Sequence, residues 1–252
     1  MAWKNARDTE KRVTRTGKVY LVGAGPGDPG LITIRGRYLL EQAEVVVYDY
    51  LANKKLLKYA PKDALLIYAG KKGGTKHTHS QEEISQMLVD HALAGKIVVR
   101  LKGGDPFIFG RGGEEVEKLY DAKVPFEVVP GVTSASAAAT YAGIPITHRD
   151  YTASVAFVTG HEDPTKEASN IDWASLAKGA GTLVIYMGIK NLPIIAEHLL
   201  QAGRSPETPV AVVRWASTPE QKTVVGTLGT ITRIVVEEKV KPPSLIIVGD
   251  VV

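Results

Sequence analysis

The first half of the 252-residue sequence alternates short apolar runs with segments of helical periodicity, and this alternation limits the folds it can adopt. The apolar runs, rich in β-forming residues, lie at 18–22, 45–48, 64–69, 97–101 and 126–129. The helical patterns that separate or follow them lie at 31–43, 53–58, 80–94 and 111–122. Strands that alternate with helices form parallel sheets whose faces the helices cover. The sequence therefore predicts an α/β fold with a mostly parallel sheet.

The second half of the sequence indicates another sheet with a different strand arrangement. An alanine-rich helical stretch at 133–142 precedes apolar runs at 154–159, 182–187, 209–214, 222–226 and 244–248. The third and fourth of these runs are close enough in sequence to pair as an antiparallel hairpin. We therefore predict a mixed sheet here, and two α/β domains that span residues 17–140 and 141–252.

The net charge of +4 does not describe a basic protein body. Residues 1–16 hold five Lys or Arg and two Asp or Glu, so the remaining 236 residues share a net charge of only +1. A nucleic-acid-binding protein usually carries a basic stripe on its folded body, so the sequence argues against a nucleic-acid partner. Residues 1–16 lack the apolar core of a signal peptide and are expected to form a flexible tail.

Two absences in the composition narrow the functional classes. The sequence has no cysteine, which excludes disulfides, thiolate metal sites and thiol nucleophiles. No apolar run approaches the roughly 18 residues that a membrane helix needs. We therefore expect no membrane partner and a location in the reducing cytoplasm.

The most informative segment follows the predicted strand at 97–101. It reads Arg100-Leu-Lys-Gly-Gly-Asp-Pro-Phe-Ile-Phe-Gly-Arg-Gly-Gly-Glu-Glu115. Glycines directly after a strand let a ligand approach the backbone without meeting a Cβ atom. Asp105 is then held at the carboxyl end of a strand, where open α/β sheets bind small molecules. The segment therefore predicts a ligand site.

This segment and five others resemble the motifs of the tetrapyrrole methylases. The others, in chain order, are Gly23-Ala-Gly-Pro-Gly-Asp28, Val47-Tyr-Asp49, Pro130-Gly-Val-Thr-Ser-Ala135, Thr147-His-Arg-Asp150 and Tyr186-Met-Gly188. The similarity extends over residues 17–252 and depends on long motifs that recur in order. It implies two α/β domains, one with a mostly parallel and one with a mixed sheet, and an active-site cleft between them.

The resemblance also implies an activity. The branch of the family that this sequence resembles most transfers two methyl groups from S-adenosylmethionine to uroporphyrinogen III, giving precorrin-2 through precorrin-1. It further implies a homodimer and a place in sirohaem or cobalamin biosynthesis. Two alternatives stay open, namely methylation of a later precorrin and a non-catalytic protein that binds an adenosyl ligand.

The resemblance implies nine residues that contact the methyl donor. They are Pro26, Gly103, Gly104, Asp105, Ile108, Thr133, Ser134, Met187 and Ala216. Some of them have structural alternatives, since Thr133 and Ser134 can cap a helix and a methionine after a strand, such as Met187, is often part of the core. The turn that contains Ala216 departs from the family pattern at Trp215.

Two residues are implied to act in catalysis. Asp49 directly follows the predicted strand at 45–48 and matches the family's proton acceptor, although an aspartate here can also cap the next helix. Lys71 matches a proposed proton donor. It can equally bind a substrate carboxylate or be a solvated surface lysine, and the adjacent Lys72 can replace it.

Charge alone indicates which residues hold the substrate. Uroporphyrinogen III carries eight carboxylates, so Arg111 and Arg149 are predicted to bind it through charge-assisted hydrogen bonds. His77 and His79 form a pair without a third ligand of matching type placed nearby in the sequence. We therefore predict no metal site.

The glycine-rich loop at 23–30 also resembles a dinucleotide-binding fingerprint. The third glycine of that fingerprint would fall at position 28, where the sequence has an aspartate. Pro26 and Pro29 stiffen the loop and reduce its backbone N–H donors. An NAD-dependent oxidoreductase is therefore disfavoured.

Overall fold

The first half of the chain forms a five-stranded sheet in which all neighbouring strands are parallel. The computed structural model describes residues 16–70, 79–161 and 171–252. The strands are β1 (Lys18–Gly23), β2 (Val45–Tyr48), β3 (Leu65–Tyr68), β4 (Ile97–Lys102) and β5 (Phe126–Val129), in the order β3-β2-β4-β1-β5. The predicted strands and their parallel arrangement are therefore confirmed.

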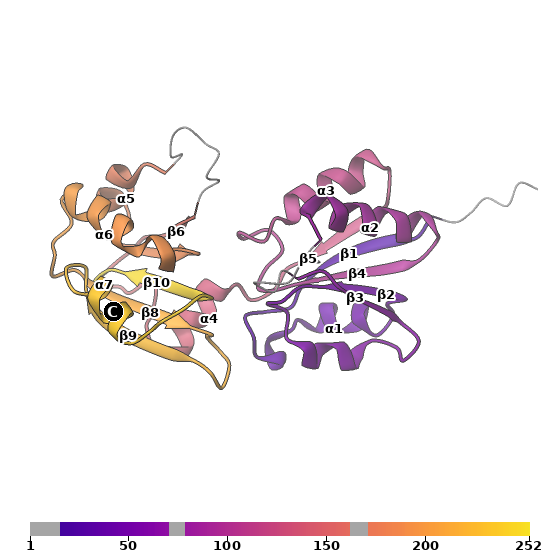
Figure 1. Cartoon of the computed structure of the whole chain (residues 1–252), viewed down its shortest axis with the longest axis horizontal. Helices are drawn as coiled ribbons and strands as arrows, with labels where there is room; N and C mark the ends of the chain where they lie inside the picture. The colour runs from indigo at the N-terminus through magenta and orange to yellow at the C-terminus, as the bar shows by residue number, and fades with distance from the viewer. Residues whose placement is uncertain (1–15, 71–78, 162–170) are drawn as a thin grey trace, which may run out of the picture.

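Helices cover both faces of this sheet (Figure 1). They are α1 (Ile34–Leu40), α2 (Gln81–Leu93), α3 (Gly112–Asp121) and the 3₁₀ helix η2 (Lys54–Tyr59), while the short 3₁₀ helix η1 (Pro29–Leu31) has no buried residue. One layer of buried strand side chains packs with α2 and α3, and another packs with α1 and η2. A helix forms within the predicted segment 31–43, but it is shorter, since α1 spans only Ile34–Leu40. Thr33 caps α1 by accepting a hydrogen bond from the Gly36 N–H at 3.0 Å, so the α-helix begins only after Thr33.

The second half contains a five-stranded mixed sheet, as predicted. Its strands are β6 (Val155–Thr159), β7 (Thr182–Tyr186), β8 (Pro209–Arg214), β9 (Lys222–Thr227) and β10 (Ser244–Val248), in the order β6-β7-β10-β8-β9. β6 and β7 pair in parallel, whereas the other neighbouring strands are antiparallel. β8 and β9 form the predicted hairpin, in which Pro209 pairs with Thr227 and Arg214 pairs with Lys222.

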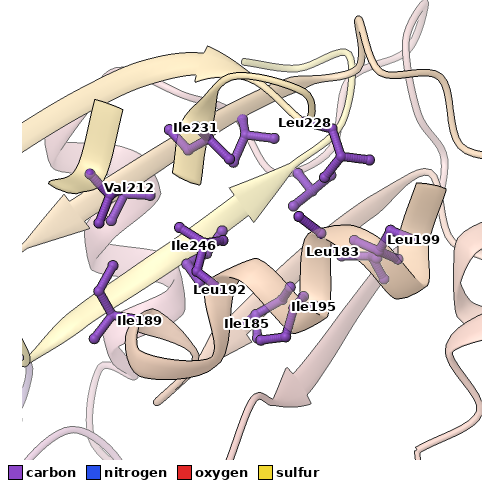
Figure 2. Packing of buried hydrophobic residues seen from close by; sticks show 14 of the residues in the cluster. Leu183, Ile185, Ile189, Leu192, Ile195, Leu199, Val212, Leu228, Ile231 and Ile246 are labelled. Atoms are coloured by element: carbon purple, nitrogen blue, oxygen red, sulfur yellow. The ribbon is translucent and has the colours of Figure 1, made fainter. Parts of the chain in front are cut away.

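Helices that the sequence patterns did not predict pack against the second sheet. They are α5 (Trp173–Gly179), α6 (Leu192–Gln201), α7 (Ile231–Glu237) and the 3₁₀ helix η3 (Ile189–Asn191). Figure 2 shows Leu192 of α6 and Ile231 of α7 in one cluster with Ile185 and Ile246 of the strands. Among the described residues, no helix has both the length and the apolar character that a membrane crossing requires.

The helix α4 (Ser134–Tyr141) also packs against the second sheet. Ala135, Ala138 and Ala139 are buried in one cluster with side chains of β7, β8 and β10. Small side chains let a helix lie close to a sheet without leaving voids. The domain boundary near residue 140 stays a prediction, and the packing associates α4 with the second sheet rather than the first.

Candidate active site

Loops from the two halves of the chain meet beside the carboxyl ends of β1, β2 and β8. The Asp28 N–H donates to Ser217 Oγ at 3.1 Å, and the Tyr141 hydroxyl donates to Asp28 Oδ2 at 3.0 Å. The rings of Tyr50 and Trp215 meet edge to face with their centroids 5.7 Å apart. These contacts hold the strand ends of both sheets around a common space.

A cavity of about 380 Å³ lies in this space, with walls from both halves of the chain. All nine residues that the resemblance implies for the methyl donor line it, namely Pro26, Gly103, Gly104, Asp105, Ile108, Thr133, Ser134, Met187 and Ala216. The structure thus brings together residues from segments that are far apart in the sequence. Their contact with a donor stays a prediction.

Glycines at the ends of β1, β4 and β5 let three backbone segments converge at this cavity. A Cβ atom on Gly131 would lie 2.3 Å from the Gly104 carbonyl oxygen, and one on Gly23 would lie 2.5 Å from the Gly131 Cα atom. The backbones of Gly25 and Gly104 also exchange two hydrogen bonds of 3.2 and 2.7 Å. A side chain at Gly23 or Gly131 would force these segments apart, so the convergence requires glycine.

Gly104 and the preceding Gly103 have different surroundings. Gly104 has a φ of +67°, and the nearest atom to an added Cβ would be the Ser134 nitrogen at 3.8 Å. A Cβ on Gly103 would instead lie 2.4 Å from the Leu51 Cβ atom. A ligand can therefore approach the backbone of Gly104, whereas Gly103 allows the loop that carries Leu51 to pack closely.

The Asp105 carboxylate joins two of the loops in the cavity wall. Its Oδ1 accepts a hydrogen bond from the Phe107 N–H at 2.8 Å, and its Oδ2 accepts one from the Gly131 N–H at 3.0 Å. A carboxylate has lone pairs for further donors beyond these two. Asp105 therefore has a fixed orientation and keeps the capacity to bind a ligand.

Tyr186, which the sequence analysis did not select as a site residue, organises the start of α4. Its hydroxyl lies 2.6 Å from Thr133 Oγ1 and accepts a hydrogen bond from the Ala135 N–H at 3.2 Å. The alternative that Thr133 caps α4 with its own side chain is wrong, because that side chain makes no capping hydrogen bond. Tyr186 of β7 instead accepts a hydrogen bond from an N–H in the first turn of α4. No local sequence pattern indicates a partner from a distant strand.

Tyr186→Phe should lower the free energy of unfolding by about 1–2 kcal/mol, because the Ala135 N–H and the Thr133 hydroxyl lose a partner in a largely buried place. Urea denaturation followed by circular dichroism measures this change. Tyr120→Phe is the matched control, since Tyr120 is 74% exposed on α3, and it should change stability by less than about 0.5 kcal/mol. Equal stabilities of the two variants would contradict this function of Tyr186.

Unusual backbone conformations gather at the cavity. Phe109, Met187 and Trp215 line it and have φ values of +51°, +53° and +46°. Such conformations of non-glycine residues cost of order 1–3 kcal/mol and cluster at functional sites. Met187 is also 50% exposed, so the alternative that it belongs to the core is wrong.

A second cavity, of about 500 Å³, adjoins the first. Both cavities have Phe109, His161 and Met187 in their walls. Arg111 lines the second cavity, where its Nη2 lies 2.6 Å from Glu114 Oε2. His161 was not among the residues predicted from the sequence, although its place directly after a predicted strand that ends in glycine is a signal that could have identified it.

Other predicted residues lie apart from these cavities. Arg149 is exposed on the turn between His148 and Thr152 and does not line either cavity. Lys71 and His77 lie outside the described residues. Within the described ranges, no three His, Cys, Asp or Glu side chains are grouped so that they could hold a metal ion.

Asp49 follows β2, and hydrogen bonds hold both of its carboxylate oxygens. Oδ1 accepts from the N–H groups of Leu51 at 3.0 Å and Ala52 at 3.1 Å, and Oδ2 lies 3.4 Å from Arg100 Nη2. The alternative that Asp49 caps the next helix is wrong, because Asn53 caps η2. Asp49 instead stabilises the turn that places Leu51 in the wall of the first cavity.

Behind Asp49 lies a cluster of three buried charged side chains that the sequence analysis did not identify. Glu115 Oε1 accepts hydrogen bonds from Lys102 Nζ at 2.8 Å and Arg100 Nε at 3.1 Å. Burial alone would raise the pKa of Glu115, but the charges of Arg100 and Lys102 outweigh it and lower that pKa. Burial and the nearby Arg100 lower the pKa of Lys102. Arg100 and Lys102 are two residues apart in an apolar strand, so their side chains share one face of the sheet. This spacing in the sequence could have indicated a buried charged cluster.

The family model described as Tetrapyrrole (Corrin/Porphyrin) Methylases matches residues 18–232. A uroporphyrinogen-III C-methyltransferase from Priestia megaterium is 57% identical over 236 residues, which cover 94% of this chain and 98% of that protein. Among solved structures, the chain is similar to a uroporphyrin-III C-methyltransferase from Thermus thermophilus, crystallised in complex with S-adenyl homocysteine. The two sequences are 45% identical, the TM-score is 0.78, and the match covers 93% of this chain and 98% of the Thermus chain. The chain is also similar to the solved structure of a cobalamin biosynthetic enzyme, a cobalt precorrin-4 methyltransferase. The sequences are 32% identical, the TM-score is 0.82, and the match covers 93% of this chain and 95% of that enzyme. This chain belongs to the tetrapyrrole methylase family.

Proposed function

We propose that this protein is an S-adenosylmethionine-dependent C-methyltransferase that methylates uroporphyrinogen III twice and gives precorrin-2 through precorrin-1. The observation that carries the proposal is the pair of adjoining cavities between the two halves of the chain. The cavity of about 380 Å³ gathers all nine residues predicted for the donor, and Arg111 lines the cavity of about 500 Å³. Their shared wall is the place where donor and acceptor would meet.

The chemistry of the first cavity's lining suits the methyl donor. S-adenosylmethionine supplies an electrophilic methyl group attached to a positively charged sulfonium. The Asp105 carboxylate and the hydroxyls of Thr133 and Ser134 offer polar contacts, and the open side of Gly104 admits a ligand to the backbone. Apolar side chains such as Leu245 complete the wall and would exclude water.

The second cavity suits an acidic acceptor. Arg111 presents a planar guanidinium that can bind one of the eight carboxylates of uroporphyrinogen III through two hydrogen bonds. Because Arg111 already pairs with Glu114 at 2.6 Å, substrate binding would exchange one carboxylate partner for another. Phe107, an exposed aromatic side chain in the same wall, offers apolar surface to the macrocycle. Arg149 is proposed as a more distant anchor for a substrate carboxylate.

We assign proton acceptance to Asp49 and proton donation to Lys71. When a pyrrole carbon takes the methyl group from the sulfonium, the S–CH3 bond breaks and the ring becomes positively charged. Loss of the pyrrole N–H proton neutralises the ring, and a carboxylate held in a fixed direction can accept that proton. Asp49 is 25% exposed and lies on the turn that carries Leu51 into the donor cavity wall. The assignment of Lys71, which lies outside the described residues, rests on the family resemblance.

We further propose that the protein is a homodimer and acts in the cytoplasm. The homodimer follows from the resemblance to the family, and the absence of cysteine is compatible with a reducing compartment. Light scattering on the purified full chain should give twice the mass of one chain. The mass of a single chain at micromolar concentration would contradict the dimer.

Anaerobic incubation of the purified protein with S-adenosylmethionine and uroporphyrinogen III tests the proposed activity. The expected result is a product that carries two added methyl groups, with release of a matching amount of S-adenosylhomocysteine. Mass spectrometry of the tetrapyrrole and chromatography of the nucleoside measure both. Donor binding without transfer to uroporphyrinogen III would overturn the substrate assignment and leave a later precorrin as the next candidate.

A later precorrin is the second candidate because the cobalt precorrin-4 methyltransferase shares the fold at 32% identity. A panel of precorrins in the same assay separates the two candidates. We expect uroporphyrinogen III to give the highest kcat/KM. Faster turnover of a later precorrin would favour the second candidate.

A further inference from the structure

Four charged side chains meet at the carboxyl end of β4. Arg100 and Lys102 supply two positive charges, and Glu115 and Asp49 supply two negative charges. The side chains of Arg100, Lys102 and Glu115 are 4%, 3% and 0% exposed, whereas that of Asp49 is 25% exposed. Asp49 is thus the most exposed member of the cluster, and it lies on the turn that carries Leu51 into the wall of the first cavity.

Three buried charges are an unusual way to fill this part of the sheet. Removing an ion from water costs several kcal/mol, and well-packed apolar replacements of a buried ion group are often neutral or stabilising. Val98 lies on the same face of β4 as Arg100 and Lys102, and there an apolar side chain fills the space against Ile84 and Leu88 of α2. The charges at the end of the strand therefore point to a role beyond core packing.

Hydrogen bonds on several sides fix the guanidinium of Arg100. Its Nε donates to Glu115 Oε1 at 3.1 Å, and its Nη1 donates to the carbonyl oxygens of Val47 at 3.4 Å and Leu101 at 3.2 Å. Glu115 is in turn held by Lys102 at 2.8 Å. A planar guanidinium fixed at two nitrogens has a defined direction for its third nitrogen, Nη2.

That third nitrogen faces Asp49. Arg100 Nη2 lies 3.4 Å from Asp49 Oδ2, while the backbone N–H groups of Leu51 and Ala52 bind Oδ1. We propose that Arg100, held in place by Glu115, is a positioning residue that fixes Oδ2 of Asp49 for proton acceptance. The inference rests on the proposed function, because it concerns the group to which that function assigns the proton.

Arg100 acts on the reaction through Asp49. Neither Arg100 nor Asp49 lines either cavity, but Asp49 is 25% exposed on the turn that carries Leu51 into the first cavity wall. Arg100 is 4% exposed, and its other polar contacts are with Glu115 and two backbone carbonyls. Its effect on turnover should therefore depend on the carboxylate at position 49. A structural role in the core predicts instead an effect that is independent of Asp49.

A double-mutant cycle separates these two roles. Turnover is measured from S-adenosylhomocysteine release for the wild type, Arg100→Lys, Asp49→Asn and the double variant, with both substrates saturating. Lysine keeps the positive charge but cannot make the forked hydrogen bonds of Arg100. We expect Arg100→Lys to lower kcat about fivefold in the wild-type background and less than about twofold in the Asp49→Asn background.

Two further variants complete the experiment. Arg35→Lys is the matched control, since Arg35 makes a surface ion pair with Glu127 at 2.9 Å, and its turnover should equal that of the wild type. Glu115→Gln keeps the side-chain volume but removes the carboxylate that holds Arg100. Glu115→Gln should lower kcat as Arg100→Lys does, and this loss should also shrink in the Asp49→Asn background. If Arg100→Lys does not bind S-adenosylhomocysteine, Glu115→Gln takes its place in the cycle.

The possible outcomes are distinguishable. An equal loss from Arg100→Lys in both backgrounds, or no loss in the wild-type background, would overturn the positioning role while the proposed function stands. Full turnover by Asp49→Asn would remove Asp49 from the reaction and overturn the positioning role with it. No methyl transfer by the wild type would overturn the proposed function and this inference together.

Discussion

Asp49→Asn should lower the turnover of methyl transfer at least tenfold, which corresponds to about 1.4 kcal/mol of activation free energy. Asparagine has nearly the same shape, and its carbonyl oxygen can still accept the hydrogen bonds from Leu51 and Ala52 that hold Oδ1. It cannot accept a proton as a carboxylate does. The turn that places Leu51 in the cavity wall should therefore persist while the proposed proton acceptor is lost.

The measurement has two readouts that separate chemistry from binding. Release of S-adenosylhomocysteine during turnover gives kcat, and calorimetric titration with S-adenosylhomocysteine gives the donor-site affinity. We expect the affinity of Asp49→Asn to stay within about twofold of the wild type, because a residue used only in the transition state leaves ground-state binding unchanged. Asp121→Asn, an exposed aspartate at the end of α3, is the control. Near-normal turnover of Asp49→Asn would remove Asp49 from the mechanism.

Gly131→Ala should abolish measurable binding of S-adenosylhomocysteine and lower the free energy of unfolding by about 3 kcal/mol. The added Cβ would lie 2.3 Å from the Gly104 carbonyl oxygen and 2.8 Å from the Gly23 Cα atom. Both neighbours are backbone atoms at strand ends, so neither can move aside as a flexible side chain would. The Gly131 N–H also holds the Asp105 carboxylate at 3.0 Å, so a displaced backbone would disturb the cavity wall as well.

Gly113→Ala is the matched control for this experiment. Gly113 lies in the first turn of α3, and an added Cβ there would have no atom within 4 Å. Alanine in a helix is as favourable as or better than glycine, so this control should lose no stability. Urea denaturation and calorimetric titration of both variants test the prediction. Binding by Gly131→Ala as tight as that of the control would contradict the need for close backbone approach.

Most strands were predictable from the sequence because they read as almost continuous apolar runs. Burial explains this for β2, β7 and β10, whereas Leu65 and Leu66 of β3 are exposed. Each strand of the first sheet lies within two residues of its predicted ends, and the hairpin of β8 and β9 followed from the short loop between two apolar runs. The helices α5 and α7, of seven residues each, are too short to produce a periodic pattern that stands out. They become helical because they pack against the second sheet.

The site was predictable only in part. The nine residues of the first cavity were selected because long motifs identify the family, and their spatial proximity could not be derived from local patterns. His161 contributes to the cavity walls without any motif of its own, and Tyr186 lies in the Tyr186-Met-Gly188 motif but was not selected as a site residue. Arg149 was selected for its charge, and the structure places it on an exposed turn outside both cavities.

The sequence by itself determined the positions of the strands along the chain, the two kinds of sheet and the family, because these depend on local apolar patterns and on contiguous motifs. Only the tertiary structure decided which polar groups meet. Arg100 and Asp49 are 51 positions apart, and Thr133 and Tyr186 are 53 positions apart. Hydrogen bonds of this kind form when separate strand ends are brought to one edge of the sheets, and no local propensity encodes them. The candidate site combines such contacts with local ones, such as the hydrogen bond from the Phe107 N–H to Asp105.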